Sequence, residues 1–174
     1  MPEDLTRHNS FSANSHYPEP KIECKNINYA NILLQDYAGT VSELTASCLY
    51  VFQHIVSEDR YKDYSKLIKG ISIVEMKHLH LLGETIKLLG VKPVYTNSVY
   101  PCGQLWSAAY VNYTDRILDM ILEDIKSEKQ AIRNYEKDMC LINDKYIRKL
   151  LERIIEDEKV HLKLFKEMYK EYSK

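Results

Sequence analysis

Residues that break helices are scarce in this chain, and their scarcity limits the folds open to it. The 174 residues include only five glycines and five prolines, and the long segments between them carry apolar residues at helical spacing. The pattern predicts four long helices, over 28–57, 59–89, 114–140 and from about 146 to near the C-terminus. We therefore expect an all-α protein.

The connections between the predicted helices indicate how they are arranged. The turns SEDR at 57–60 and INDK at 142–145 are short, so each joins two antiparallel neighbours. The connection 90–113 is long enough to run the length of a bundle. We expect a four-helix bundle over residues 26–174 with one long crossover between its second and third helices. Residues 1–25, which are polar and contain three of the prolines, are expected to form a loose N-terminal arm.

Charge and cysteine usage argue against several classes of partner. The 24 basic and 25 acidic residues are well mixed and give a formal net charge of −1; a nucleic-acid surface would need a basic stripe. The longest apolar stretch, LTASCLYVFQHIV, is too short to span a membrane, and the polar N-terminus does not resemble a signal peptide. Four scattered cysteines without a C-x-x-C pair suit a reducing compartment, so we expect a cytoplasmic protein.

Two Glu-x-x-His motifs stand out, EMKH at 75–78 and EKVH at 158–161. Each places an acid within the apolar stripe of a predicted helix, where a charged side chain is costly unless it is compensated. Glu43 and Glu128 interrupt the stripes of the other two helices in the same way. Three small residues leave space beside the first of these acids: Gly39, Ala46 and Ser47.

The four glutamates lie at similar distances along the chain from the two short turns, so antiparallel pairing brings them into one layer. No Lys or Arg lies near these glutamates on the inward face of the helices. The alternative, solvent-exposed acids on loosely packed helices, does not explain why all four lie at the same level along the bundle axis. Two divalent cations would balance four buried carboxylates. Di-metal bundles take one Glu from each of two helices and Glu-x-x-His from each of the others. The predicted metal ligands are Glu43, Glu75, His78, Glu128, Glu158 and His161.

The segments around these motifs resemble the ferritin-like superfamily, and within it the rubrerythrin-type proteins and the manganese catalases. LLQDYAGTVSELTASCLYV followed by EMKH, and LEDIKSEKQAIRNYEKD followed by EDEKVHLKLF, carry the resemblance, which covers residues 26–170. It implies that Glu43 and His78 are terminal ligands of one metal ion, and Glu128 and His161 of the other. Two glutamates remain as bridging candidates, of which the second acts as a base instead in catalase-like members: Glu75 and Glu158.

Two further residues are candidates for supporting the site. Tyr50, two turns after Glu43, matches a tyrosine that both families place beside the metals, and we predict a catalytic role for it; the alternative is an ordinary core aromatic. Asp157 precedes the second motif, where an Asp can orient a ligating His of the opposite helix; the alternative is a surface acid. Val74 occupies the equivalent place before the first motif, so such support would be one-sided.

Glu and His ligands suit iron and manganese, so the expected cofactors are two Fe or two Mn ions. The first functional hypothesis is an oxidoreductase that reacts with hydrogen peroxide or dioxygen, as a catalase or as a peroxidase with a separate electron donor. The others are an iron store with ferroxidase activity, and a metal-stabilised structural protein of the spore-coat type. We expect a homodimer or a higher homo-oligomer, with no nucleic acid and no membrane as partner.

Overall fold

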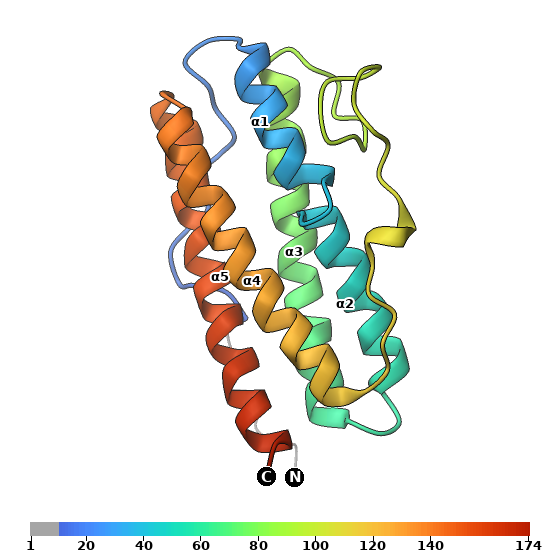
Figure 1. Ribbon diagram of the computed structural model, residues 1–174. Coiled ribbons are helices and arrows are strands. Elements are labelled where there is room, and N and C mark those ends of the chain that lie inside the picture. Colours follow the sequence, from blue (N-terminus) through green and yellow to red (C-terminus); the bar gives the residue numbers. More distant parts are fainter. Residues whose placement is uncertain (1–10) are drawn as a thin grey trace, which may run out of the picture.

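The computed structural model describes residues 11–174 as a bundle of long helices. Within this range the elements are α1 (Ile27–Ala38), α2 (Glu43–Ser57), α3 (Lys62–Leu88), the 3-10 turn η1 (Ala108–Tyr110), α4 (Ile117–Leu141) and α5 (Lys145–Tyr172). Helices α1 and α2 follow one another and together make the first of four bundle helices (Figure 1). The expected all-α fold, with its long crossover between the second and third bundle helices, is confirmed.

The prediction of one continuous helix over 28–57 is wrong, because the chain leaves helical geometry at Gly39. This residue is extended, with φ −79° and ψ −170°, and a Cβ there would lie 2.4 Å from the carbonyl oxygen of Gln35. Ser42 then caps α2 by accepting a hydrogen bond from the Thr45 N–H at 3.2 Å. The break makes Glu43 the first residue of α2, at a helix end that favours a negative charge.

A polar layer crosses the bundle between two apolar clusters. On α3, Leu67, Ile68 and Ile71 belong to one buried cluster, whereas Leu82 and Ile86 belong to the other. The same change of cluster occurs along α4 and α5. The predicted ligands of these helices lie between the two clusters, so each side of the layer is sealed by apolar packing.

The crossover and the N-terminal segment are both attached to the bundle. Trp106 of the crossover donates its indole N–H to the Thr45 hydroxyl at 2.9 Å. The described part of the arm, residues 11–25, is not loose: Glu23 donates its backbone N–H to Asp144 at 2.7 Å, and Arg153 donates to the carbonyl of Ser15 at 2.7 Å. In residues 11–174, no helix combines the length and the apolar character needed to cross a bilayer.

Candidate metal centre

The six predicted ligands converge in the polar layer and form two overlapping groups. In each group, one ligand atom from every member lies within 4.8 Å of the others. The first group is Glu43, Glu75, His78 and Glu158, and the second is Glu75, Glu128, Glu158 and His161. Two glutamates therefore belong to both groups. None of the six residues is more than 3% exposed.

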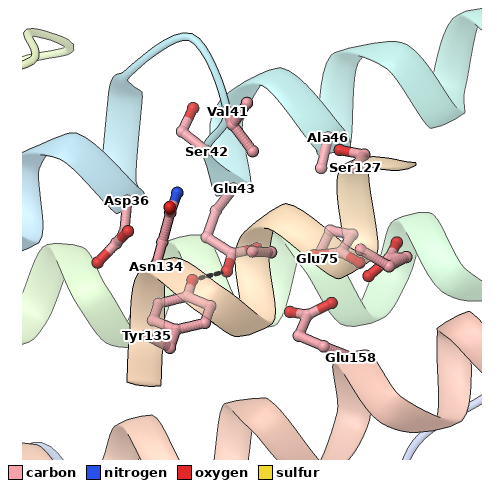
Figure 2. Close-up of a pocket in the computed structure, with 12 residues that line it drawn as sticks. Asp36, Val41, Ser42, Glu43, Ala46, Glu75, Ser127, Asn134, Tyr135 and Glu158 are labelled. Atoms are coloured by element: carbon pink, nitrogen blue, oxygen red, sulfur yellow. Dashed lines mark hydrogen bonds between the residues drawn. The ribbon is translucent and has the colours of Figure 1, made fainter. Parts of the chain in front are cut away.

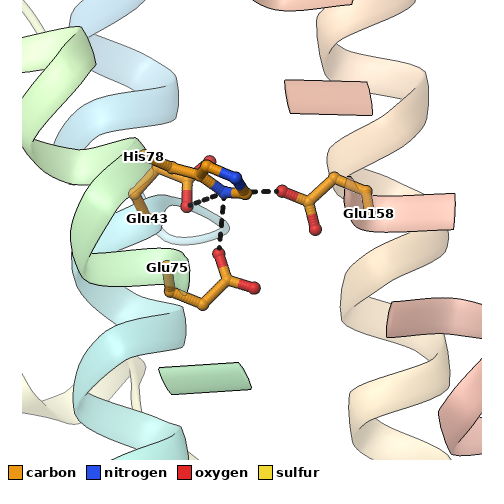
Figure 3. Close-up of side chains that lie close together, drawn as sticks. All are labelled: Glu43, Glu75, His78 and Glu158. Carbon is orange, nitrogen blue, oxygen red and sulfur yellow. Dashed lines mark ion pairs between the residues drawn. The ribbon is translucent and has the colours of Figure 1, made fainter. Parts of the chain in front are cut away.

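The helices bring these side chains together in a simple way. On α3 and on α5 the acid and the histidine are three residues apart, so both point from one helix face. The pair α2 and α3 packs against the pair α4 and α5, and the glutamates of α2 and α4 reach in from the remaining sides. Figure 3 shows the first group: Glu43 and Glu75 lie on the same side as His78, and Glu158 faces the His78 ring from the opposite helix.

Each histidine turns one ring nitrogen toward three carboxylates. His78 Nδ1 lies 3.2 Å from Glu158 and 3.4 Å from Glu75, and His161 Nδ1 lies 3.0 Å from Glu75 and 3.3 Å from Glu158. A single N–H cannot satisfy several carboxylates at once. Accordingly, buried atoms of the layer lack a hydrogen-bond partner, namely Glu43 Oε2, Glu75 Oε1, Glu158 Oε1 and His78 Nδ1.

The opposite ring nitrogens are occupied, which leaves the inward ones available to a metal. His161 Nε2 lies 2.9 Å from the carbonyl oxygen of Phe11; a carbonyl only accepts, so this nitrogen carries the proton. His78 Nε2 lies 2.9 Å from Asp157. In the neutral ring the inward Nδ1 then holds a lone pair, as a metal ligand requires. Orphaned carboxylate oxygens and inward lone pairs together fit a pair of divalent cations.

Asp157 has the position expected of a residue that orients a histidine from another helix. Its side chain is fully buried, so the alternative of a surface acid is wrong. Besides His78, it contacts Arg153 Nη1 at 2.7 Å and the Ala13 N–H at 2.7 Å, and it accepts from the Tyr17 hydroxyl. Burial raises its pKa, but the hydrogen bonds from His78, Tyr17 and Arg153 outweigh burial and lower the pKa below its ordinary value. Asp157 is therefore ionised.

Within residues 11–174, only one of the two histidines is hydrogen-bonded to a carboxylate outside the metal ligands. This agrees with the prediction from Val74, which precedes the first motif where Asp157 precedes the second. His78 is held by a carboxylate, and His161 by a backbone carbonyl of the N-terminal segment. No sequence pattern points to Phe11, because any residue carries a carbonyl and the segment has no helical period. The structure thus makes residues 11–17 part of the surroundings of both histidines.

Two of the four glutamates, Glu43 and Glu128, belong to only one of the two groups. Each of them accepts a hydrogen bond from a buried tyrosine. The Tyr50 hydroxyl donates to Glu128. The Tyr135 hydroxyl donates to Glu43, as Figure 2 shows. Burial and the nearby carboxylates raise the pKa of both phenols, so both stay protonated as donors. Tyr50 therefore serves the glutamate of α4 rather than that of its own helix. Tyr135 was missed, although it stands two turns after Glu128 as Tyr50 does after Glu43.

A small cavity, here called the central cavity, opens beside the glutamates. Its volume is about 20 Å³, which is room for about one water-sized molecule. Its walls include Ala46, Ala131, Glu43, Glu75 and Glu158 (Figure 2). Of the small residues expected to leave space, Ala46 does line the cavity, whereas Gly39 forms the helix break and Ser47 is buried elsewhere in α2. A ligand the size of one water molecule fits beside the carboxylates.

Comparisons with known proteins agree with this geometry. The sequence profile of the ferritin-like domain matches residues 40–174. A probable manganese catalase of Clostridium acetobutylicum is 30% identical over 169 residues, an alignment that covers 84% of this chain and 72% of that protein.

Two solved structures share the fold at lower identity. KatB, a manganese catalase from Anabaena, superposes with a TM-score of 0.83 at 21% identity, covering 93% of this chain and 80% of that one. A bacterioferritin from Desulfovibrio desulfuricans, whose structure contains a diiron site, has a TM-score of 0.68 at 24% identity, covering 82% and 78%. At these identities the likeness concerns the fold alone.

Proposed function

Because this chain belongs to the ferritin-like family, we propose that it is a catalase-type oxidoreductase that decomposes hydrogen peroxide at a pair of manganese ions. The observation that carries the proposal is the pair of overlapping carboxylate and histidine groups around a cavity of about 20 Å³. The 30% identity to a probable manganese catalase supports manganese and peroxide over iron and dioxygen.

We assign the metal ligands by the composition of the two groups. Glu43 and His78 belong only to the first group, and Glu128 and His161 only to the second, so these residues are the terminal ligands. Of the two glutamates common to both groups, Glu75 would be shared by the two ions, and Glu158 is kept for proton transfer. When bound, the ions supply redox chemistry and acidify a peroxide that contacts them.

The chain's own residues supply proton transfer and positioning. Glu158 Oε1 has no hydrogen-bond partner among the described residues and lies at the wall of the central cavity, so it is the proposed acceptor for the peroxide proton. Tyr50 holds the carboxylate of Glu128 in one orientation, and Tyr135 does the same for Glu43. Two apolar clusters on either side of the layer exclude bulk water.

Metal binding is expected to release protons from the layer. In the metal-free layer, burial and the carboxylate of Glu75 raise the pKa of Glu43, and burial and Glu158 raise that of Glu128. Burial lowers the pKa of His78 and His161, but neighbouring carboxylates outweigh burial and raise it. The raised pKa values favour the protonated forms of these groups, and protons compete with divalent cations, so metal affinity rises with pH.

Proton release is measured by titrating Mn²⁺ calorimetrically into metal-free protein, in buffers of different ionisation enthalpy. Below pH 6.5, where free histidine is itself protonated, the protonated imidazoles keep their full contribution to the stability of the metal-free fold. That contribution is lost as pH rises through their raised pKa values. Release of no protons on binding two ions would contradict the assignment.

Replacing Tyr50 with Phe is expected to leave two metal ions per chain and to slow peroxide decomposition about tenfold. The lost hydrogen bond to Glu128 is worth about 1.4 kcal/mol if it matters mainly in the transition state. Tyr135→Phe removes the corresponding bond to Glu43 and should act similarly. Tyr113→Phe is the matched control, since that hydroxyl is bonded to the carbonyl of Ala108 on an exposed part of the crossover. If the Tyr50→Phe protein loses its metal ions, Tyr50 is needed for metal binding rather than for the rate of peroxide decomposition.

The proposed activity is tested by elemental analysis together with an oxygen electrode. The manganese-loaded protein should contain two ions per chain and release one O₂ for every two H₂O₂ consumed, without a reductant. Consumption that requires a reductant and releases no O₂ would indicate a peroxidase. Absence of any consumption, with a 24-subunit assembly in size-exclusion chromatography, would indicate storage; a homodimer or small oligomer agrees with the proposal.

A further inference from the structure

A second pair of buried carboxylates lies outside the metal centre, at the break between α1 and α2. Asp36 of α1 and Asp138 of α4 are 3% and 7% exposed. Asp36 Oδ2 is buried and has no hydrogen-bond partner among the described residues. Asp36 lines one hollow together with Asp138 and another together with Glu43, and burial and these two carboxylates raise its pKa. A buried, unsatisfied carboxylate beside another is costly unless a proton or a cation joins them.

The pair lies where the outside of the bundle meets the central cavity. Asp36 and Asn134 line that cavity together with Glu43 (Figure 2). The same two residues also line a second hollow, here called the outer groove, whose walls include Gln35, Lys137 and Asp138. Asp36 and Asn134 are thus the shared wall between the groove and the metal centre. The donors in this wall are carboxylates and a side-chain amide, which are oxygen ligands suited to hard divalent cations.

We propose that Asp36 and Asp138 form a transit site for divalent cations, which takes Mn²⁺ or Fe²⁺ from the outer groove and passes it to Glu43. The inference rests on the proposed metal centre, because a transit site needs a destination. The unpartnered oxygen of Asp36 supplies the first inner ligand, and Glu43, which shares the central cavity with Asp36, supplies the next. Lys137, which lines the groove, repels a cation electrostatically. Its side chain is long and the residue is exposed, so the ammonium group can point into solvent.

The test follows the rate at which metal-free protein takes up Mn²⁺ at low ionic strength, with proton release read by a pH dye in a stopped-flow instrument. Asp36→Asn and Asp138→Asn should each slow loading about tenfold, because focused negative charge raises the association rate of a cation. Both should still reach two ions per chain by elemental analysis. Lys137→Gln should load two- to threefold faster. Glu136→Gln is the matched control, since this acid is exposed on the same helix and should load at the wild-type rate.

The outcomes separate this inference from the proposed function. Wild-type protein that binds fewer than two ions would overturn the metal centre itself. If the wild-type protein binds two ions but Asp36→Asn and Asp138→Asn load as fast as it does, the transit site is overturned. The two carboxyl groups would then be explained by a proton that they share. Equal slowing by Glu136→Gln would also overturn it, because net charge rather than this site would then set the rate.

Discussion

Mn²⁺ at a free concentration of about 1,000 times its Kd is expected to raise the melting temperature of the metal-free protein by about 15 °C or more. A ligand at 1,000 times its Kd stabilises the native state by about 4 kcal/mol per site. Two ions therefore contribute roughly 8 kcal/mol, and each kcal/mol moves the midpoint of a chain of this size by about 2 to 4 °C. The physical cause is the compensation of four buried carboxylates. Differential scanning calorimetry with and without a chelator measures the shift.

Two histidines on α3 provide a matched pair for this experiment. His78→Gln removes a buried ligand candidate and should reduce the metal-dependent shift by about half, because one of the two ions loses its nitrogen. His80 is 63% exposed and lies 3.2 Å from Glu84 on the outer face, so His80→Gln should keep the full shift. A wild-type melting temperature that does not change on chelation would show that metal ions do not compensate the layer.

Glu128→Gln is expected to change stability in opposite directions with and without metal. In the metal-free protein the substitution removes a buried acid from a crowded layer, which should stabilise the fold by about 1 kcal/mol or more. With metal, it removes a charged ligand, and the affinity for one ion should fall about 100-fold, or roughly 3 kcal/mol. Thermal unfolding and a Mn²⁺ titration measure the two effects on one sample.

The amide of the variant can still accept the hydrogen bond of Tyr50, so the shape of the site is preserved. Glu136→Gln on the exposed face of α4 should change neither quantity. A metal-free Glu128→Gln protein that is less stable than the wild type would mean that the carboxyl group of Glu128 itself stabilises the layer through its bond to Tyr50.

The bundle and the convergence of the six candidate ligands could be predicted because they follow from helical periodicity. An acid in an apolar stripe is visible in the sequence. The two short turns determine which acids lie at the same level along the bundle axis. The break at Gly39 was missed, since a single glycine within a helical pattern does not reveal that the chain becomes extended. Its consequence is that Glu43 enters the site from a helix N-terminus rather than from a helix middle.

Other parts of the site depend on partners that no local pattern encodes. Phe11 acts through its backbone oxygen, which every residue has, and the pairing of Asp36 with Asp138 arises only when α1 lies beside α4. Tyr135 could have been predicted, since it follows Glu128 at the same spacing at which Tyr50 follows Glu43. Its bond to the glutamate of the opposite helix pair, however, follows from the packing of α2 against α4 and not from spacing.

The contact between Phe11 and His161 joins residues 150 positions apart in the chain, and that between His78 and Asp157 joins residues 79 apart. Contacts of such long range form late, because most of the loop-closure entropy must be lost before they are made. Metal ions at the proposed centre would then find their complete set of ligands only after the folding barrier has been crossed. They should leave the refolding rate nearly unchanged and slow unfolding by almost the whole factor by which they stabilise the protein. The loaded protein is thus protected kinetically, by the slow opening of a native state that its ions hold closed.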